Sequence, residues 1–142
     1  MPSKKTHLFH PALLVIDMQN SYCTPGGSYE KYGGIIGADL NAYNKIIPNI
    51  VRLLAACREL EVPVFYSQQV REESGIDLFT QLHRIVPIRR AEFLRIPACI
   101  VGTRDAAILD ELKPAKGEQV VVKRRDSAFQ DTELVFGETG QG

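Results

Sequence analysis

Three short apolar runs, each closed by a polar or charged residue, constrain the fold of this 142-residue chain more than any other feature. They are PALLVID at residues 11–17, VPVFYS at 62–67 and EQVVVKRR at 118–125. Short apolar runs that end abruptly are typical of strands buried inside a sheet. We therefore predict three buried strands.

Helical patterns separate these runs. In residues 41–60, apolar side chains recur every three or four positions on one broad face, which predicts a long amphipathic helix. Pro48 fits best in a first turn, so we expect the regular helix to begin near Ile47. Residues 18–34 are rich in turn-forming residues and are predicted to be a loop, as is part of 89–102. Shorter helices are predicted at 76–85, at 103–112 with Thr103 as N-cap, and at 127–136.

Alternating strands and helices predict an α/β fold with a Rossmann-like parallel sheet, helices on both faces and three αβα layers. The length suits a single domain. We place that domain at residues 1–136 and expect 137–142, which are polar and glycine-rich, to form a disordered tail.

Composition excludes several classes of function. The 17 basic and 17 acidic residues are interspersed and cancel, so a nucleic-acid partner is not expected. No apolar run is long enough to cross a membrane. The N-terminus lacks the apolar core of a secretory signal. The 3 cysteines, without C-x-x-C spacing, argue against disulfides and zinc and favour a cytoplasmic location. His7, His10 and His83 also lack the spacing of metal ligands.

Two charged residues mark the predicted strand ends. Asp17 follows the first apolar run and Lys123 follows the third. Ligands of open parallel sheets bind beyond the carboxyl ends of the strands. If the two strands are near neighbours, Asp17 is a candidate general base, and Lys123 would keep it ionised and stabilise developing negative charge. The alternative is that both charges simply meet water.

Neighbouring polar and aromatic residues complete the candidate site. Gln19 and Asn20 either orient Asp17 or a substrate, or form turn hydrogen bonds at the strand end. Tyr22 and Phe129 are candidates for a pocket wall, with core packing as the alternative. Gln68 and Gln69 end the second strand and are expected near the same cleft. Arg124 and Arg125 are interpreted as charged side chains in contact with water at the end of the third strand. The predicted substrate contacts are Gln19, Tyr22, Gln68 and Phe129.

Four segments resemble the isochorismatase-like cysteine hydrolases, in the same order along residues 11–134. They are ALLVIDMQNSYCTPGG, VPVFYS, VGTRDAAILDELKP and VVVKRRDSAFQDTEL. The first resembles the family's D-M-Q-N strand end, and the last its K-x-R-x-S-A-F-x-x-T-x-L motif. The family includes isochorismatases, nicotinamidases, and N-carbamoylsarcosine and ureidoacrylate amidohydrolases.

The resemblance implies a Cys-Asp-Lys triad on a doubly wound sheet. Asp17 matches the aspartate that takes the cysteine proton, and Lys123 matches the lysine that supports the thiolate. In most members the cysteine attacks an amide-type carbonyl and forms a thioester, which breaks a C–N bond of a small molecule. No cofactor is implied. The D-x-H metal motif of nicotinamidases is replaced by SQQVREESG at 67–75, so no metal is expected either.

The family cysteine, by this resemblance, lies on a loop after a fourth strand, which this chain does not reach beyond Leu134. We therefore predict a truncated hydrolase without activity; the alternative is a non-catalytic homologue that binds a small molecule or a partner. Cys23 remains open as a substitute nucleophile, Cys57 is assigned to the core, and Cys99 has no candidate partner. Strand one is central in the family. Without a fourth strand it becomes an apolar edge, which predicts a homo-oligomer.

Overall fold

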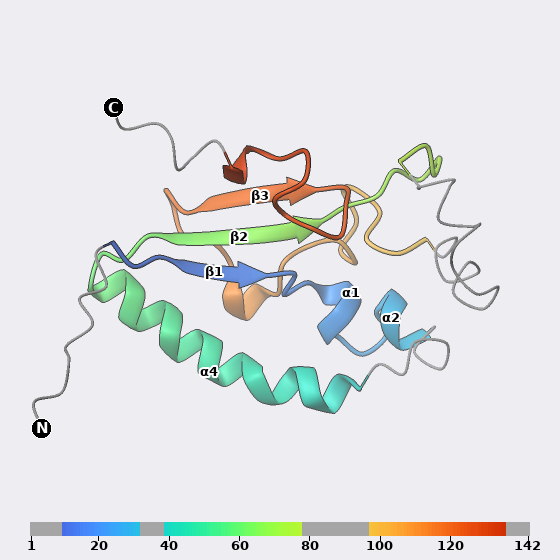
Figure 1. Cartoon of the computed structure of the whole chain (residues 1–142). Coiled ribbons are helices and arrows are strands. Elements are labelled where there is room, and N and C mark those ends of the chain that lie inside the picture. Colours follow the sequence, from blue (N-terminus) through green and yellow to red (C-terminus); the bar gives the residue numbers. More distant parts are fainter. Residues whose placement is uncertain (1–9, 32–38, 78–96, 136–142) are drawn as a thin grey trace, which may run out of the picture.

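The computed structural model describes residues 10–31, 39–77 and 97–135 (Figure 1). The described elements, in chain order, are β1 (Leu13–Ile16), α1 (Asn20–Cys23), α2 (Ser28–Lys31), α4 (Leu40–Glu59), β2 (Val64–Gln69), the 3₁₀ turn η1 (Asp110–Leu112), β3 (Gln119–Lys123) and the 3₁₀ turn η2 (Glu133–Val135).

The three strands form one parallel sheet in the order β1-β2-β3. The register places Val15 beside Tyr66 and Tyr66 beside Val120. In Figure 1 the three arrows point the same way, so all three carboxyl ends lie at one edge. The prediction of an α/β fold with a parallel sheet is confirmed.

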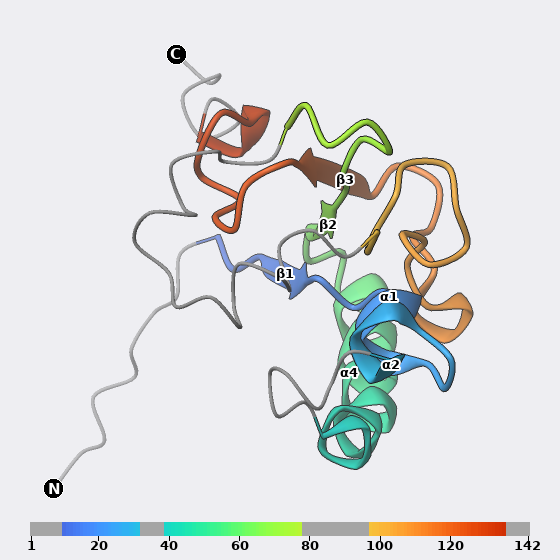
Figure 2. The same cartoon turned by 90° about the vertical axis from the view of Figure 1, so that its right-hand side faces the viewer.

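Helix α4 covers one face of the sheet. Its Leu54 is 1% exposed and packs in a core with Val15, Tyr66 and Leu112. Figure 2 shows α4 below the sheet, with the 97–118 segment beside it. Among the described residues, no α-helix covers the opposite face, so the expected second helical layer is not seen in that part of the chain.

The segment after β3 lies across the opposite face of the sheet. Phe129 and Leu134 from that segment line a cavity of about 710 Å³ together with Leu14 and Phe65 from the strands. Most of the remaining lining comes from residues that precede β1 and β2, joined by Gln119 at the start of β3 and by Glu133 in η2. The cavity therefore opens at the amino ends of the strands.

The prediction that the regular helix begins near Ile47 was wrong. Helix α4 begins at Leu40, and Pro48 lies inside it. The Asp39 side chain caps the first turn by accepting a hydrogen bond from the Asn41 N–H at 2.9 Å. Pro48 is exposed, while Ile47 and Leu54 on either side of it pack in the core. Burial of that face sustains the helix through the proline.

The helix predicted at 103–112 does not form beyond η1. The backbone of this segment bonds to the residues around α1 instead: Asn20 N–H donates to the Ala107 carbonyl at 2.9 Å, and Leu109 N–H donates to the Met18 carbonyl at 3.0 Å. Tertiary hydrogen bonds thus replace the intrahelical ones. The predicted loop at 18–34 was also too simple, because it contains α1 and α2.

The helix predicted at 127–136 is reduced to turns and η2. Asp131 has a φ of 55°, in the left-handed region that a right-handed helix excludes. The helix predicted at 76–85 lies largely outside the described residues, as do 137–142. In the described part, no helix is both long and apolar enough to cross a bilayer.

Candidate active site

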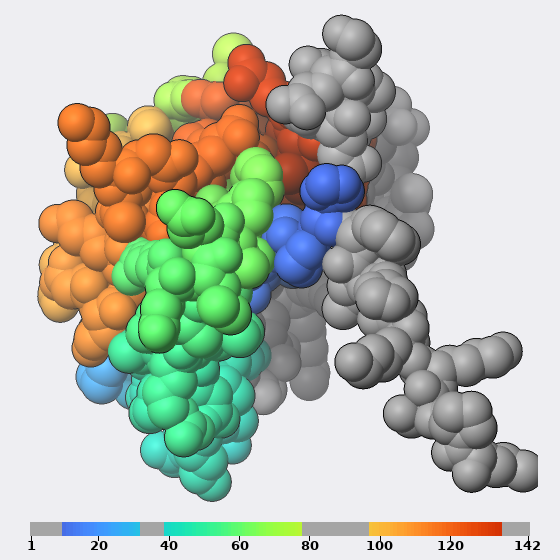
Figure 3. Space-filling view, turned by 90° about the vertical axis from the view of Figure 1, so that its left-hand side faces the viewer, coloured from blue at the N-terminus to red at the C-terminus, as the bar shows by residue number. Residues whose placement is uncertain are grey.

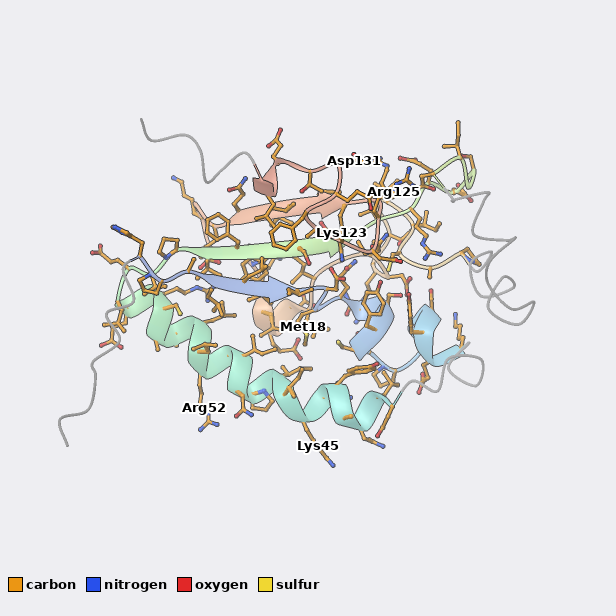
Figure 4. The ribbon with its side chains drawn as sticks, in the orientation of Figure 1. Met18, Lys45, Arg52, Lys123, Arg125 and Asp131 are labelled. Carbon is orange, nitrogen blue, oxygen red and sulfur yellow. The ribbon has the colours of Figure 1, made fainter. Side chains whose placement is uncertain are left out.

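Asp17 and Lys123 meet at the carboxyl edge of the sheet. Asp17 Oδ2 lies 2.6 Å from Lys123 Nζ, although the two residues come from strands that are not adjacent. The Lys123 side chain is 3% exposed and that of Asp17 26% exposed. Lys123 Nζ also donates to the Asp126 carbonyl at 2.7 Å. Figure 4 labels Lys123 at the end of the sheet where β3 ends.

A left-handed backbone conformation turns Asp17 toward Lys123. Strand alternation would place Asp17 on the α4 face with Leu13 and Val15. Lys123 pairs in register with Gln69, and the alternation along β2 places Gln69 on the face away from α4. Lys123 therefore lies on that opposite face as well. The φ of 52° at Asp17 breaks the alternation, and aspartate tolerates this conformation better than most residues.

Ser67 holds Asp17 in this orientation. Its hydroxyl donates to Asp17 Oδ1 at 2.7 Å, and the Asp17 N–H approaches both the hydroxyl and carbonyl oxygens of Ser67 at 3.2 Å. Ser67 is 1% exposed. Sequence reasoning missed this residue, although a serine at the end of an apolar strand is a detectable signal. With Ser67 on Oδ1 and Lys123 on Oδ2, the carboxylate is bonded at both oxygens.

Gln19 acts as a clamp between the strand ends. It has no exposed surface, and its Nε2 donates to the Gln69 and Ala106 carbonyls at 2.8 and 2.7 Å. Its Oε1 accepts from the Gln69 N–H at 2.8 Å. This favours hydrogen bonding at the strand end over the predicted contact with a substrate.

The other predicted contacts are spread around the site. The Gln68 side chain donates to the Ala106 carbonyl at 2.8 Å and is partly buried. The Tyr22 ring lies 4.2 Å from that of Tyr29, and burial raises the pKa of Tyr22 far above its usual range. Phe129 is 65% exposed and lines the cavity at the amino ends of the strands, which neither Asp17 nor Lys123 lines.

None of the three cysteines has the setting of an activated thiolate. Cys23 and Cys99 are 4% and 1% exposed, and burial raises the pKa of both thiols. Cys57 lies in the core between α4 and the sheet. The Cys23 environment therefore argues against it as a substitute nucleophile.

Asp105 organises the loops beside the site and was not singled out from the sequence. Its carboxylate accepts from the Ser28 N–H at 3.0 Å, the Ser28 hydroxyl at 2.7 Å and the Cys99 N–H at 2.8 Å. Burial opposes ionisation, but these hydrogen bonds together lower the pKa of Asp105. Asp105 thus ties α2 to the 97–109 segment.

Charged side chains near the site form ion pairs or hydrogen bonds with other residues of this chain. Arg124 forms an ion pair with Glu72, and Arg125 donates to the Asp77 carbonyl at 2.7 Å. Within the described ranges, no group of three or more His, Cys, Asp or Glu side chains is placed to hold a metal ion. His10 is exposed, while His7 and His83 lie outside those ranges.

Comparison with known proteins identifies the family. The model of the isochorismatase domain matches residues 11–136. The chain belongs to the isochorismatase family. Two similar curated family members are proteins named ureidoacrylate amidohydrolase, from Yersinia enterocolitica and Agrobacterium fabrum. They are 33% and 32% identical to this chain over 130 residues, which are 87% of this chain and 55% of each relative. The chain thus spans about half the length of these relatives.

Solved structures agree with this family assignment. An isochorismatase family protein from Desulfovibrio vulgaris superposes with a TM-score of 0.66 at 29% identity, covering 90% of this chain and 60% of that one. The pyrazinamidase of Pyrococcus horikoshii has a TM-score of 0.61 at 20% identity, covering 93% and 65% of the two chains, and shows likeness of fold alone.

Proposed function

We propose that Asp17 and Lys123 form the base half of a hydrolytic centre for C–N bonds of small amide or ureido compounds. The observation that carries this proposal is the 2.6 Å contact between the two charges at the carboxyl edge of the sheet. A carboxylate held at this edge can take a proton from a nucleophile. The ammonium beside it favours the ionised carboxylate and offsets negative charge that develops at a carbonyl.

The substrate class is proposed from two relatives. Both are named ureidoacrylate amidohydrolase, and each shares about a third of its aligned residues with this chain. A small ureido or amide compound is therefore the substrate proposed here. A cytoplasmic location and self-association, predicted from the sequence, accompany this proposal.

None of the three cysteines has the exposure that the nucleophile of this centre needs. Cys23, Cys57 and Cys99 are all buried, and the raised pKa of Cys23 and Cys99 disfavours their thiolates. We therefore expect this 142-residue chain, assayed alone, to show no cysteine-dependent turnover. The second candidate function, a module that binds small molecules or a partner without catalysis, is favoured by the same burial.

The first test assays the chain itself. Ammonia release from ureidoacrylate and a panel of small amides is expected to stay at background, while titration of native thiols should find few reactive groups. Saturable binding of a panel compound without turnover would support the binding module. Turnover that disappears in Cys23→Ser would contradict our account of the nucleophile.

The second test supplies a nucleophile. Residues 1–135 are fused to the part of the Yersinia relative that the match with this chain leaves uncovered, and folding of the chimera is checked by circular dichroism. We expect ammonia release that falls by about 100-fold or more in Asp17→Asn and Lys123→Met. Asp110→Asn, an exposed aspartate in η1, is the matched control and should leave the rate unchanged. A folded, active chimera that keeps its full rate without Asp17 would overturn the proposed role.

A further inference from the structure

The side chain of Gln69 is a nearly buried amide that lacks a hydrogen-bond partner among the described residues. It is 5% exposed, and the hydrogen bonds of Gln69 in that part of the chain, such as the two with the Gln19 side chain, involve its backbone N–H and carbonyl. The described polar side-chain atoms that protein fully encloses without a partner are Ser21 Oγ and Asp77 Oδ1. The Gln69 amide is not one of them, so it keeps contact with solvent. A polar group in this state calls for an explanation.

Gln69 lies beside the charged pair of the candidate site. It pairs in register with Lys123 on the face of the sheet away from α4. Ser67, which holds Asp17, lies on the same face two residues earlier along β2. Neighbouring strands are about 4.8 Å apart, so the amide of Gln69 and the ammonium of Lys123 leave the sheet side by side. Asp17 is 26% exposed and marks the point at which a small ligand can reach this edge.

The neighbouring Gln68 is placed differently. Its side chain leaves β2 on the α4 face, as that of Tyr66 does, and donates to the Ala106 carbonyl at 2.8 Å. The sequence predicts Gln68 as a substrate contact, whereas the alternation along β2 puts Gln69 on the face that carries Lys123. Of the two glutamines, Gln69 is therefore the one whose amide is available at the site.

We propose that Gln69 is a specificity-determining residue that recognises the amide or ureido group of a small ligand. This inference rests on the proposed function and names the group of the substrate that is recognised. A glutamine side chain presents a carbonyl acceptor beside an N–H donor. A primary amide or a ureido group presents the complementary donor and acceptor. Two parallel hydrogen bonds would then satisfy both polar atoms of the buried side chain.

The charges at this edge favour a neutral group in that position. Lys123 is already paired with Asp17, and its Nζ also donates to the Asp126 carbonyl. A ligand carboxylate in the same place would approach the Asp17 carboxylate and has no N–H to donate to the carbonyl oxygen of Gln69. A site built to hydrogen-bond a ligand group rejects analogues that lack it, because the buried partner is left unpaired. We therefore expect selection of amides and ureido compounds over acids of the same shape.

Two isosteric compounds test this selectivity on the unmodified 142-residue chain. 3-Ureidopropionate carries a ureido group where glutarate carries a methylene and a carboxylate, and the two molecules have the same length. In proton–nitrogen correlation spectra, the side-chain NH₂ signals of Gln69 are assigned by their absence from Gln69→Met. They should shift saturably with 3-ureidopropionate and stay in place with glutarate. Equal shifts with both compounds, or none with 3-ureidopropionate, would overturn the proposal.

The variant Gln69→Met separates recognition from a structural role. Methionine keeps the length of the side chain but offers no N–H and only a weak acceptor. Because no hydrogen bond within the described residues is lost, the midpoint of thermal unfolding should stay the same or rise. Binding of 3-ureidopropionate, followed at the backbone signals of Ser67 and Lys123, should weaken about 10-fold or more. Unchanged binding, or a lowered midpoint, would contradict the assigned role.

The matched control is Gln119→Met. Gln119 is an exposed glutamine on the same face of the sheet, at the start of β3. Figure 3 views the molecule from the amino ends of the strands, with the orange region that includes the start of β3 on this side, away from the carboxyl edge. This variant should bind 3-ureidopropionate as tightly as the unmodified chain.

These readouts are separate from the proposed function because none of them requires turnover. Unselective binding, together with a chimera whose hydrolysis depends on Asp17, would remove the role of Gln69 alone. Selective binding through Gln69, together with an active chimera that is indifferent to Asp17, would instead remove the hydrolytic role of the charged pair and leave the recognition of the amide or ureido group in place.

Discussion

At the scale of single residues, Lys123 depends on Asp17 because its side chain is 3% exposed. Asp17→Asn removes the negative charge that pairs with this buried ammonium, and we expect it to lower the free energy of unfolding by about 3 kcal/mol. Urea denaturation at fixed protein concentration measures this loss. Adding Lys123→Met should recover much of it, since the unpaired charge is then gone. Strictly additive losses in the double variant would show that the two residues are not coupled.

Gln19 should matter more for stability than its neutral side chain suggests. Gln19→Leu removes three buried hydrogen bonds and leaves both backbone groups of Gln69 without that partner, so we expect a loss of about 3 kcal/mol. Gln68→Leu is the matched control. It removes one partly buried bond to Ala106 and should cost about 1 kcal/mol. Equal losses in the two variants would argue against the clamp.

At the scale of elements, α4 contains a proline whose cost is outweighed by burial of the apolar face of the helix. Pro48→Ala restores an N–H inside the helix and relieves the clash with the preceding turn, so we expect the free energy of unfolding to rise by about 1–3 kcal/mol. Thermal and urea melts provide the measurement. Asn49→Ala, at the next position, should gain only about 0.5 kcal/mol. No gain from Pro48→Ala would mean that the helix already accommodates the proline without cost.

The elements also show where local patterns succeed and fail. All three strands form where apolar runs predict them, but the prediction that all three are buried holds only in part, since Ile16 of β1 and Val122 of β3 are 58% and 48% exposed. The helix expected at 103–112 fails because its backbone bonds to Met18 and Asn20, far away along the chain. The early start of α4 was missed because Pro48 suggested a boundary, whereas Asp39 supplies the cap. Periodicity predicts an element but not the partners that compete for its backbone.

At the scale of the whole molecule, the Arg58–Glu118 pair joins α4 to the start of β3. Hydrogen bonds from Arg58 are the main cause that lowers the pKa of Glu118 to about 2, from an ordinary value of 4.5. A carboxyl group with a lowered pKa stabilises the fold above its unfolded value. This contribution is therefore full above pH 4.5 and is lost as the pH falls toward about 2.

Glu118→Gln should flatten the acid limb of the stability curve. We expect the difference in unfolding free energy between the unmodified chain and the variant to shrink steadily from pH 4.5 to about pH 2. Urea denaturation across this range, at constant ionic strength, measures it. Glu111→Gln, at an exposed glutamate in η1, should keep the unmodified slope. A Glu118→Gln variant with the same slope as the unmodified chain would contradict the pairing.

The three strands, the parallel α/β class, the resemblance to the isochorismatase family and the placement of Asp17 and Lys123 at strand ends could all be predicted from the amino-acid sequence. These follow from local composition and short motifs. Tertiary structure alone decided that the two charges meet across β2, that a left-handed turn redirects Asp17, and that Ser67 and Gln19 hold the strand ends. The physical reason is that the side-chain contacts of Asp17 with Lys123 and Ser67, and of Gln19 with Gln69, join residues at least 50 positions apart. Strand register sets such contacts, and no local pattern in the chain encodes it.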